Sequence, residues 1–356
     1  MDLREQLLNF YHRYPLMREQ DFVKLIFQSE FFGGHLIKNE MDAFLRLQNE
    51  AETCTKNLPF DKEPPNDDFL GMTRVNIRPF VKENKDLFLL NKIFAKSSQL
   101  ANGTLEGLNQ KLDVLLDLAS VKKIDLSYFS LKRFIGEYRS KGYPLQSHSS
   151  AVKMNYFPAY RVVKKEYWQL FDAIFLINRF LSMRLNVVVA IEGNSGTGKS
   201  FFANALQKYY GCGVICADDF FLPAQMRTQE RLATIGGNIH FERLAETLKK
   251  LKTFRDFDYL AFDCATQTYT QKTYTASPVN IVEGCYSLHP ALKDFYDIAI
   301  LVTADKATRQ QRIFLRDGEE TFQRYLQEWI PKEDEFLKTL SLYNIPTVTV
   351  DTSNDF

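Results

Sequence analysis

The sequence predicts an α/β domain with three layers and a mainly parallel sheet, preceded by a mainly helical N-terminal domain. Two observations support this fold class. After about residue 186, short apolar and β-branched runs alternate with helical stretches, whereas the first 150 residues repeat apolar positions at helical spacing. The polar stretch 140–150 contains a glycine and a proline and is a candidate linker. We therefore expect one domain over 1–150 and a second over 151–356.

The N-terminal part contains several segments in which apolar residues recur every three or four positions, as in an amphipathic helix. These segments are 19–31, 38–51, 87–100 and 105–118. A later stretch, 167–183, is the densest in apolar residues but includes Asp172 and Arg179. We expect a buried amphipathic helix there, because a membrane span needs about 18 or more uninterrupted apolar residues.

The C-terminal part carries short apolar runs that are typical of strands buried on both faces of a sheet. These runs are 187–191, 214–216, 259–262, 279–282, 298–302 and 347–350. Helical stretches such as 200–210 and 241–251 separate them. Repeated strand–helix–strand units are right-handed and give parallel strands, so the expected domain has helices on both faces of one sheet.

The composition is that of an ordinary globular protein. The chain has 356 residues and a net charge of +1, which gives no overall field to attract nucleic acid or a membrane. Its five cysteines form no CxxC pair, which is typical of reduced thiols, and its first residues lack the apolar core of a signal peptide. We expect a cytoplasmic protein without membrane association. Nucleic-acid binding is disfavoured, and an oligomer is compatible with the sequence.

A glycine-rich segment with the P-loop pattern GxxxxGK[ST] lies between the first of these strands and a helix. Its glycines let backbone N–H groups turn toward phosphate oxygens, and the helix N-terminus adds partial positive charge. Lys199 is expected to reach the β- and γ-phosphates of ATP, and Ser200 to hold Mg²⁺. The alternative is a glycine-rich turn that binds nothing, but strand, loop, lysine and helix are all present. The predicted nucleotide-binding residues are Gly193, Asn194, Ser195, Gly196, Thr197, Gly198, Lys199, Ser200 and Phe201.

Acidic residues follow two of the predicted strands. Asp218 and Asp219 come after 214–216, and Glu283 comes after 279–282. Because the carboxyl ends of parallel strands open into one crevice, an aspartate there can deprotonate an attacking hydroxyl or share the metal. Glu283 can bind Mg²⁺ as Walker-B acids do. Helix capping by the aspartates and a solvated position for Glu283 are the alternatives, and spacing alone does not distinguish Asp218 from Asp219.

Three arginines follow the strand 298–302 at helical spacing, namely Arg309, Arg312 and Arg316. They lie on one helix face, and guanidinium groups suit phosphates whose charge spreads in a transition state. A solvated basic face paired with the acids that follow is an equally good interpretation of the spacing.

Taken together and in this order, the segments GNSGTGKS, CADDFFLP, VEGCYSLHP and RQQRIFLRDG, the last of them before WIPKEDEF, resemble the uridine kinase, phosphoribulokinase and pantothenate kinase superfamily. The resemblance runs from about 187 to 349. It implies that Asp218 is the catalytic base, that Glu283 lies near the metal, and that Arg312 and Arg316 belong to a lid over the phosphates.

The same resemblance implies acceptor contacts from Asp219, Arg227 and His240, since 238–240 lies where these kinases carry a substrate-side loop. The uridine-kinase pattern is not fully matched in this loop, and residues that would recognise a uracil base are not identifiable. The acceptor is therefore not specified by the resemblance.

The N-terminal half matches no domain that we recognise. It holds polar residues in apolar settings that are far apart in the sequence, namely His35, Arg74, Asn76, Arg78, His148, Tyr160 and Arg161. These residues could form a second ligand site or bind the acceptor. We favour a structural role, in which loop backbone satisfies them.

The leading hypothesis is an ATP-dependent kinase that transfers the γ-phosphate to a hydroxyl of a small metabolite, with a nucleoside as the first candidate. A regulatory NTPase whose N-terminal domain binds a partner, and an RNA-acting kinase, are the alternatives. The acidic pair favours the first hypothesis, because a pure switch needs no base for an alcohol. The near-neutral net charge counts against the RNA-acting kinase, because RNA binding usually needs a positively charged surface.

Overall fold

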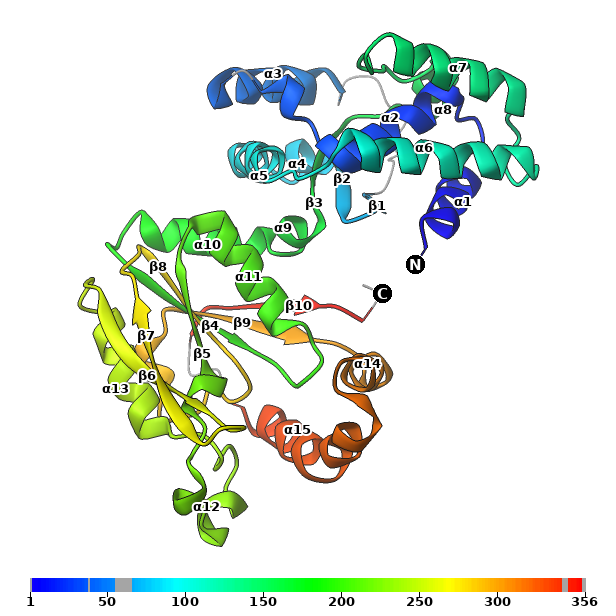
Figure 1. Ribbon diagram of the computed structural model, residues 1–356. Coiled ribbons are helices and arrows are strands. Elements are labelled where there is room, and N and C mark those ends of the chain that lie inside the picture. Colours follow the sequence, from blue (N-terminus) through cyan, green and yellow to red (C-terminus); the bar gives the residue numbers. More distant parts are fainter. Residues whose placement is uncertain (1, 38, 55–65, 341–344, 354–356) are drawn as a thin grey trace. The chain divides into compact units, whose positions relative to one another are not determined.

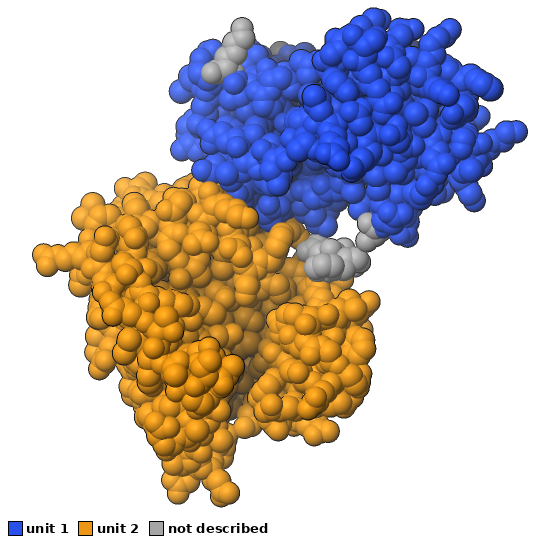
Figure 2. Space-filling view, viewed as in Figure 1, with its two compact units in different colours: residues 1–168 blue, residues 169–356 orange. Residues whose placement is uncertain are grey.

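The computed structural model describes residues 2–37, 39–54, 66–340 and 345–353. The chain divides into two compact units, residues 1–168 and 169–356 (Figure 1, Figure 2). This boundary lies later than the one expected after residue 150. The reason is that strand β3 (Tyr160–Lys164) pairs antiparallel with β2 (Met72–Asn76) inside the first unit, so the stretch 140–150 is an internal loop of that unit and not the linker.

The first unit is mainly helical, as predicted. The four predicted helices are present as α2, α3, α5 and α6, and Lys38, the expected start of the second of them, lies outside the described residues. A three-stranded antiparallel sheet in the order β1-β2-β3 accompanies the helices and was not predicted. The elements are α1 (Leu3–Arg13), α2 (Glu19–Phe31), α3 (Glu40–Cys54), β1 (Asp67–Phe69), β2, α4 (Arg78–Lys82), α5 (Leu87–Gln99), α6 (Leu105–Ser120), α7 (Tyr128–Ser140), α8 (Ser150–Tyr156), β3 and α9 (Lys165–Gln169).

One apolar core holds most of the first unit together. Leucine and phenylalanine side chains of α1, α2 and α6 are fully buried in it, including Leu7, Phe22 and Leu112. Thr104 caps α6 by accepting a hydrogen bond from the backbone N–H of Gly107. Burial of this apolar surface is the main stabilising contribution to the unit.

The second unit is a three-layer α/β domain, which confirms the predicted fold class. Its five parallel strands run in the order β10-β9-β4-β8-β5. Helices α10 and α11 pack on one face of this sheet, and α13 and α15 join the core on the other face (Figure 1). The elements are α10 (Phe171–Leu181), β4 (Val187–Glu192), α11 (Lys199–Tyr210), β5 (Gly213–Cys216), α12 (Gln229–Ala233), α13 (Phe241–Leu251), β6 (Phe257–Asp263), β7 (Thr268–Tyr274), β8 (Val279–Glu283), β9 (Ile298–Thr303), α14 (Lys306–Arg324), α15 (Ile330–Thr339) and β10 (Thr347–Asp351).

Two sequence-based expectations need correction in this unit. The run 259–262 is a strand, but β6 pairs antiparallel with β7 in a separate two-stranded sheet and does not join the parallel one. The stretch 167–183 is not one helix, because α9 ends at Gln169 and α10 begins at Phe171. Among the described residues, no helix combines the length and the apolar character that a membrane crossing would need.

Candidate active site

The loop from Gly193 to Ser200 joins β4 to α11 at the carboxyl end of the sheet. Its backbone requires glycine at two positions. A Cβ on Gly193 would lie 2.2 Å from the carbonyl oxygen of Val302, and one on Gly196, whose φ is +80°, would lie 2.7 Å from the carbonyl oxygen of Arg309. The loop is therefore packed against β9 and α14, and its tight backbone turn depends on these glycines.

Lys199 lies folded across this loop. Its Nζ donates to the carbonyl oxygen of Asn194 at 3.0 Å and contacts Cys285 Sγ at 3.2 Å, and its side chain is almost fully buried. Burial lowers the pKa of Lys199, but the nearby Cys285, Glu192 and Glu333 raise it by more, so the net shift is upward. The ammonium group is therefore charged at neutral pH and held inside the loop.

Ser200 and Glu283, the two residues expected to hold Mg²⁺, are in contact. Ser200 Oγ lies 3.2 Å from both carboxylate oxygens of Glu283, which is buried at the end of β8. The described residues contain no cluster of three or more His, Cys, Asp or Glu side chains that could hold a metal alone. A hydroxyl and one carboxylate fit Mg²⁺, because this ion binds oxygen ligands and usually takes the others from water and substrate phosphates.

Two acids of α15 contact the loop and were not assigned a role from the sequence. Glu333 is buried and accepts hydrogen bonds from the backbone N–H of Ser195 at 2.7 Å and from Ser195 Oγ at 2.6 Å. Asp334 accepts from Asn194 Nδ2 at 2.6 Å and from Arg309 Nη2 at 3.1 Å. A carboxylate thus bonds a backbone N–H that a nucleotide phosphate would need. No sequence signal indicated this contact, because the segment WIPKEDEF was used only as part of the family resemblance.

A second buried carboxylate, Glu192, fixes the start of the loop. It accepts hydrogen bonds from the backbone N–H groups of Gly193, Tyr286 and Leu288 and from Ser287 Oγ. Burial raises the pKa of Glu192 to about 7, although these backbone hydrogen bonds lower it. The sequence analysis assigned Glu192 no role. The signal that could have indicated one is its position at the end of an apolar strand, directly before the glycine-rich motif.

The adjacent aspartates differ sharply in their surroundings. Asp219 accepts from Lys272 Nζ at 2.8 and 2.9 Å and from Tyr259 Oη at 2.9 Å. The carboxylate of Asp218 has no hydrogen-bond partner among the described residues and remains accessible to solvent. Partial loss of hydration and then the charge of Glu283 raise the pKa of Asp218, while Lys199 lowers it. Asp218 is thus the member of the pair that is available to accept a proton.

The three arginines of α14 do not act alike. Arg309 is buried against Asp334, and Arg312 donates to the carbonyl oxygen of Gly196 at 3.1 Å and to Thr352. In this structure Arg312 therefore supports the loop from behind. Arg316 pairs with Asp317 and is close enough to Asp218 to lower its pKa. The spacing predicted that the three arginines lie on one helix face. In the structure, Arg309 and Arg312 support the loop, and Arg316 lies near the candidate base.

Arg227 and His240 make local contacts. Arg227 Nε donates to the carbonyl oxygen of Leu222 at 2.7 Å. His240 caps α13, with Nδ1 accepting from the backbone N–H of Arg243 at 3.3 Å. Among the described residues, neither is recorded in contact with Asp218. Their expected role toward an acceptor stays a prediction.

Comparison with known proteins bears on the second unit. No protein-family model matches this chain. Uridine kinases of Staphylococcus aureus are 29% identical to it over an alignment of 178 residues, which covers 45% of this chain and 86% of the relative. A solved structure of a possible uridine kinase from Bacillus stearothermophilus is 18% identical, covers 51% of this chain and 100% of its own, and has a TM-score of 0.38. Deoxyadenosine kinase from M. mycoides is 16% identical, with a TM-score of 0.23 and coverages of 47% and 91%.

The parallel sheet and the loop 193–200 define the second unit as a nucleotide-binding P-loop fold. The sequence similarity makes the assignment more particular. The C-terminal half of this chain is similar to the uridine kinases over most of their length.

Proposed function

We propose that the C-terminal unit transfers the γ-phosphate of ATP to a hydroxyl group of a small metabolite, with a nucleoside as the first candidate. The observation that carries this proposal is the accessible, unpartnered carboxylate of Asp218 beside Glu283 and Lys199. A nucleotide switch needs no such base, whereas phosphoryl transfer to an alcohol does.

The roles follow from what each side chain contacts. Asp218 accepts the proton of the attacking hydroxyl, and its raised pKa brings it closer to the neutral range in which a base works well. Lys199 supplies a fixed positive charge inside the loop, and Arg316 adds one near the base. Ser200 and Glu283 are the residues that would hold Mg²⁺, which when bound neutralises phosphate charge.

A groove between β5 and the β6–β7 hairpin is the proposed acceptor site. It encloses about 1300 Å³ of open space, and Cys216, Asp219, Tyr259 and Lys272 are among its lining residues. The Tyr259 ring stacks on Phe220 at an interplanar angle of 8°. The Asp219–Lys272 pair offers charge and hydrogen-bonding groups that suit a polar metabolite with a hydroxyl, whereas the Tyr259 ring is buried against Phe220.

The test is a panel of hydroxyl acceptors, nucleosides first, assayed with Mg·ATP for ADP release above the rate without acceptor. Mass spectrometry of the products must then show one added phosphoryl group. Asp218→Asn serves as the matched control, because it keeps the shape of the side chain and removes the base. ATP hydrolysis that no acceptor stimulates, and that Asp218→Asn leaves unchanged, would instead support a regulatory NTPase.

A further inference from the structure

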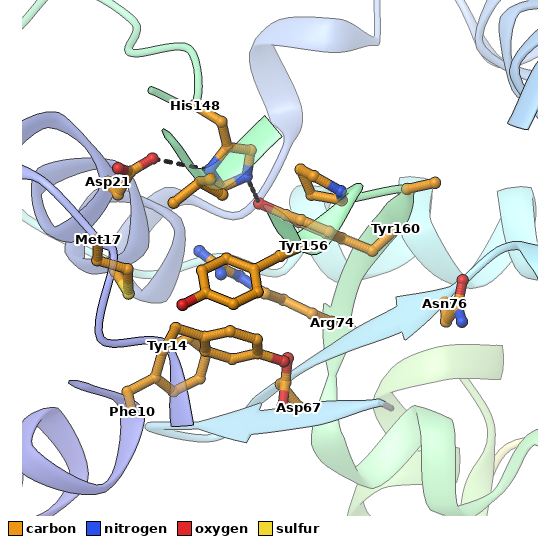
Figure 3. A pocket seen from close by; sticks show the side chains of 13 residues that line it. Phe10, Tyr14, Met17, Asp21, Asp67, Arg74, Asn76, His148, Tyr156 and Tyr160 are labelled. Carbon is orange, nitrogen blue, oxygen red and sulfur yellow. Dashed lines mark hydrogen bonds and ion pairs between the residues drawn. The ribbon is translucent and has the colours of Figure 1, made fainter. Parts of the chain in front are cut away.

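Several of the polar residues that the sequence scatters through the N-terminal half come together at one cavity. Arg74, Asn76, His148 and Tyr160 all line it, together with aromatic side chains of α1 and α8 (Figure 3). The cavity encloses about 490 Å³ of empty space, part of it open to solvent, and lies entirely within the first unit.

The other polar residues singled out in this half have local structural roles. Arg78 Nη2 donates to the carbonyl oxygen of Phe157 at 2.7 Å, and Arg161 pairs with Glu50 at 2.7 Å. His35 packs edge-on against Phe27. The structural interpretation therefore fits these three residues, and the residues at the cavity need a separate explanation.

Arg74 is the unusual residue of the cavity. Its side chain is 6% exposed, and its guanidinium group lies 5.2 Å from the Phe10 ring and 4.7 Å from the Tyr160 ring. Nη2 donates to Gln28 at 2.8 Å, but Nε has no hydrogen-bond partner in the described part of the chain. A buried charged donor without a partner costs free energy. Arg243 and Arg309 each have such a nitrogen too, but of these three arginines only Arg74 lines this cavity.

The two carboxylates that line the cavity do not accept a hydrogen bond from Arg74 Nε and are held by other groups. Asp21 accepts from His148 Nδ1 and from the backbone N–H groups of Arg18 and Ser149. Asp67 accepts from Arg13 on one oxygen and from Tyr14 Oη on the other. Their charge is met by neighbours other than Arg74.

Positive and negative groups at the cavity nearly balance, because Asp21 and Asp67 line it while Arg13 and Lys24 lie close to it. Burial and then the charge of Arg74 lower the pKa of Lys24. His148 is neutral at physiological pH, since burial lowers its pKa to about 4 despite its contact with Asp21.

The walls are aromatic and held in place. Tyr14 and Tyr156 meet edge to face with ring centroids 5.1 Å apart, and Phe10 and Tyr14 are 5.3 Å apart. On the other side, His148 Nε2 lies 2.7 Å from Tyr160 Oη, which joins Tyr160 to Asp21 through the imidazole (Figure 3). These contacts prevent the rings from collapsing into the cavity, and they present apolar faces that suit a flat ring.

We propose that this cavity binds a small aromatic compound with an acidic group, the ring lying among Phe10, Tyr14 and Tyr156 and the acid accepting from Arg74 Nε. A carboxylate and a phosphate share the chemistry that Arg74 recognises. The inference does not depend on phosphoryl transfer in the second unit, and it reverses the structural interpretation that the sequence favoured for Arg74, Asn76, His148 and Tyr160.

The experiment uses the full chain and four matched probes, namely benzoate, phenyl phosphate, benzamide and benzylamine, titrated by ligand-observed NMR up to millimolar concentration. We expect an acid to bind and the amide and amine to bind at least about tenfold more weakly, as loss of a charge-assisted hydrogen bond implies. The stronger of benzoate and phenyl phosphate then identifies the acidic group.

Three variants locate the binding. Arg74→Gln should lower the affinity for the acidic probe by about ten- to hundredfold. Ala159→Leu fills the cavity while keeping Arg74 and should also abolish binding. Arg161→Gln removes a second buried arginine, one that does not line the cavity, and should leave the affinity unchanged. Thermal unfolding establishes that each variant is folded.

The proposal is overturned if the wild-type chain binds neither acid, or if benzamide binds as tightly as benzoate. Either result would make this a water-filled cavity around a structural arginine. Equal loss of binding in folded Arg74→Gln and Arg161→Gln would also contradict it, because the effect would then be one of overall charge.

Discussion

Lys199 is held across its own loop by the Asn194 carbonyl and Cys285. We predict that Lys199→Ala abolishes acceptor-dependent turnover and weakens Mg·ATP binding, because a fixed charge aimed at the phosphates is lost. Lys208→Ala, on the exposed side of the same helix, is the control and should behave as wild type. Calorimetry with Mg·ATP and a coupled ADP assay measure the two effects. Normal turnover in Lys199→Ala would exclude the loop from the mechanism.

The difference between Asp218 and Asp219 gives a second prediction. Asp218→Asn should lower kcat by about 10²–10⁴-fold with little change in the KM for ATP, as expected when a general base is removed. Asp219→Asn should instead weaken the contacts with Lys272 and Tyr259, and so raise the KM for the acceptor more than it lowers kcat. Steady-state kinetics of both variants decides between these assignments. The reverse pattern would make Asp219 the base.

Glu333 competes for the loop, because it bonds the Ser195 N–H that a phosphate oxygen would use. We predict that Glu333→Gln tightens Mg·ATP binding by about tenfold, since a neutral hydrogen bond is roughly half as strong as a charge-assisted one. Asp334→Asn is the matched control, because Asp334 bonds the Asn194 side chain and not a backbone N–H. Weaker ATP binding in Glu333→Gln would mean that the carboxylate supports the bound state instead.

At the scale of elements, the sequence predicted the five strands of the parallel sheet from their apolar and β-branched runs. The central strands β4 and β8 are buried along their whole length, whereas β5 and the edge strand β10 are only partly buried. β7 could not be found in this way. Its residues, TYTQKTY, are exposed in all but the last position, so no apolar run marks the strand. The sequence also misassigned β6, because an apolar run looks the same in a parallel sheet and in a hairpin.

Glu192 connects the start of the loop to the residues after β8. Ionisation of Glu192 should therefore make the stability of the second unit depend on pH. The unfolded chain releases this proton near pH 4.5, and the folded chain releases it near pH 7. Between these values the folded state binds more protons, so the contribution of Glu192 falls as pH rises. We predict that the free energy of unfolding of wild type, relative to Glu192→Gln, decreases by up to about 3 kcal/mol between pH 4.5 and 7. Denaturant melts across this range test it, and a difference that does not change with pH would contradict it.

The candidate site shows the same limit of sequence reasoning at the level of contacts. Motif spacing led us to expect Lys199, Ser200, Asp218 and Glu283 in one region, because loops at the carboxyl ends of parallel strands converge. In the structure Ser200 contacts Glu283, and the charges of Glu283 and Lys199 act on Asp218. It could not indicate that Glu333 reaches the loop, since α15 arrives from a distant part of the chain. Nor could it show that Arg74 and His148 meet, because that contact depends on how the helices of the first unit pack.

At the scale of the whole molecule, the unit boundary gives a prediction about independent folding. A protein that begins at Gln169 should fold and keep its affinity for Mg·ATP, because the sheet and α10 lie within 169–356. A cut between 150 and 165, as the sequence suggests, would leave β3 without its partner β2. Circular dichroism and calorimetry compare the two truncated proteins. An insoluble 169–356 would show that the units share a core.

We further predict that acceptor-stimulated turnover is lost in this truncated protein while ATP binding is kept, if the first unit governs the acceptor. Full acceptor-dependent activity in the truncated protein would mean that the first unit has a role other than acceptor binding. Ligand binding in the cavity at Arg74 is the candidate for that role. The full-length chain assayed in parallel is the control.

The pairing of β2 with β3 also constrains the order in which the first unit can form. Helices α5, α6 and α7 lie in the chain between these two strands, so the sheet is a non-local contact and closes late. The ribosome adds about 5–20 residues per second, so the early helices wait for seconds before their sheet and the cavity beside it can be completed. A nascent chain arrested before Tyr160 should hold helices but resist protease poorly, and protection should begin only after Lys164 has emerged.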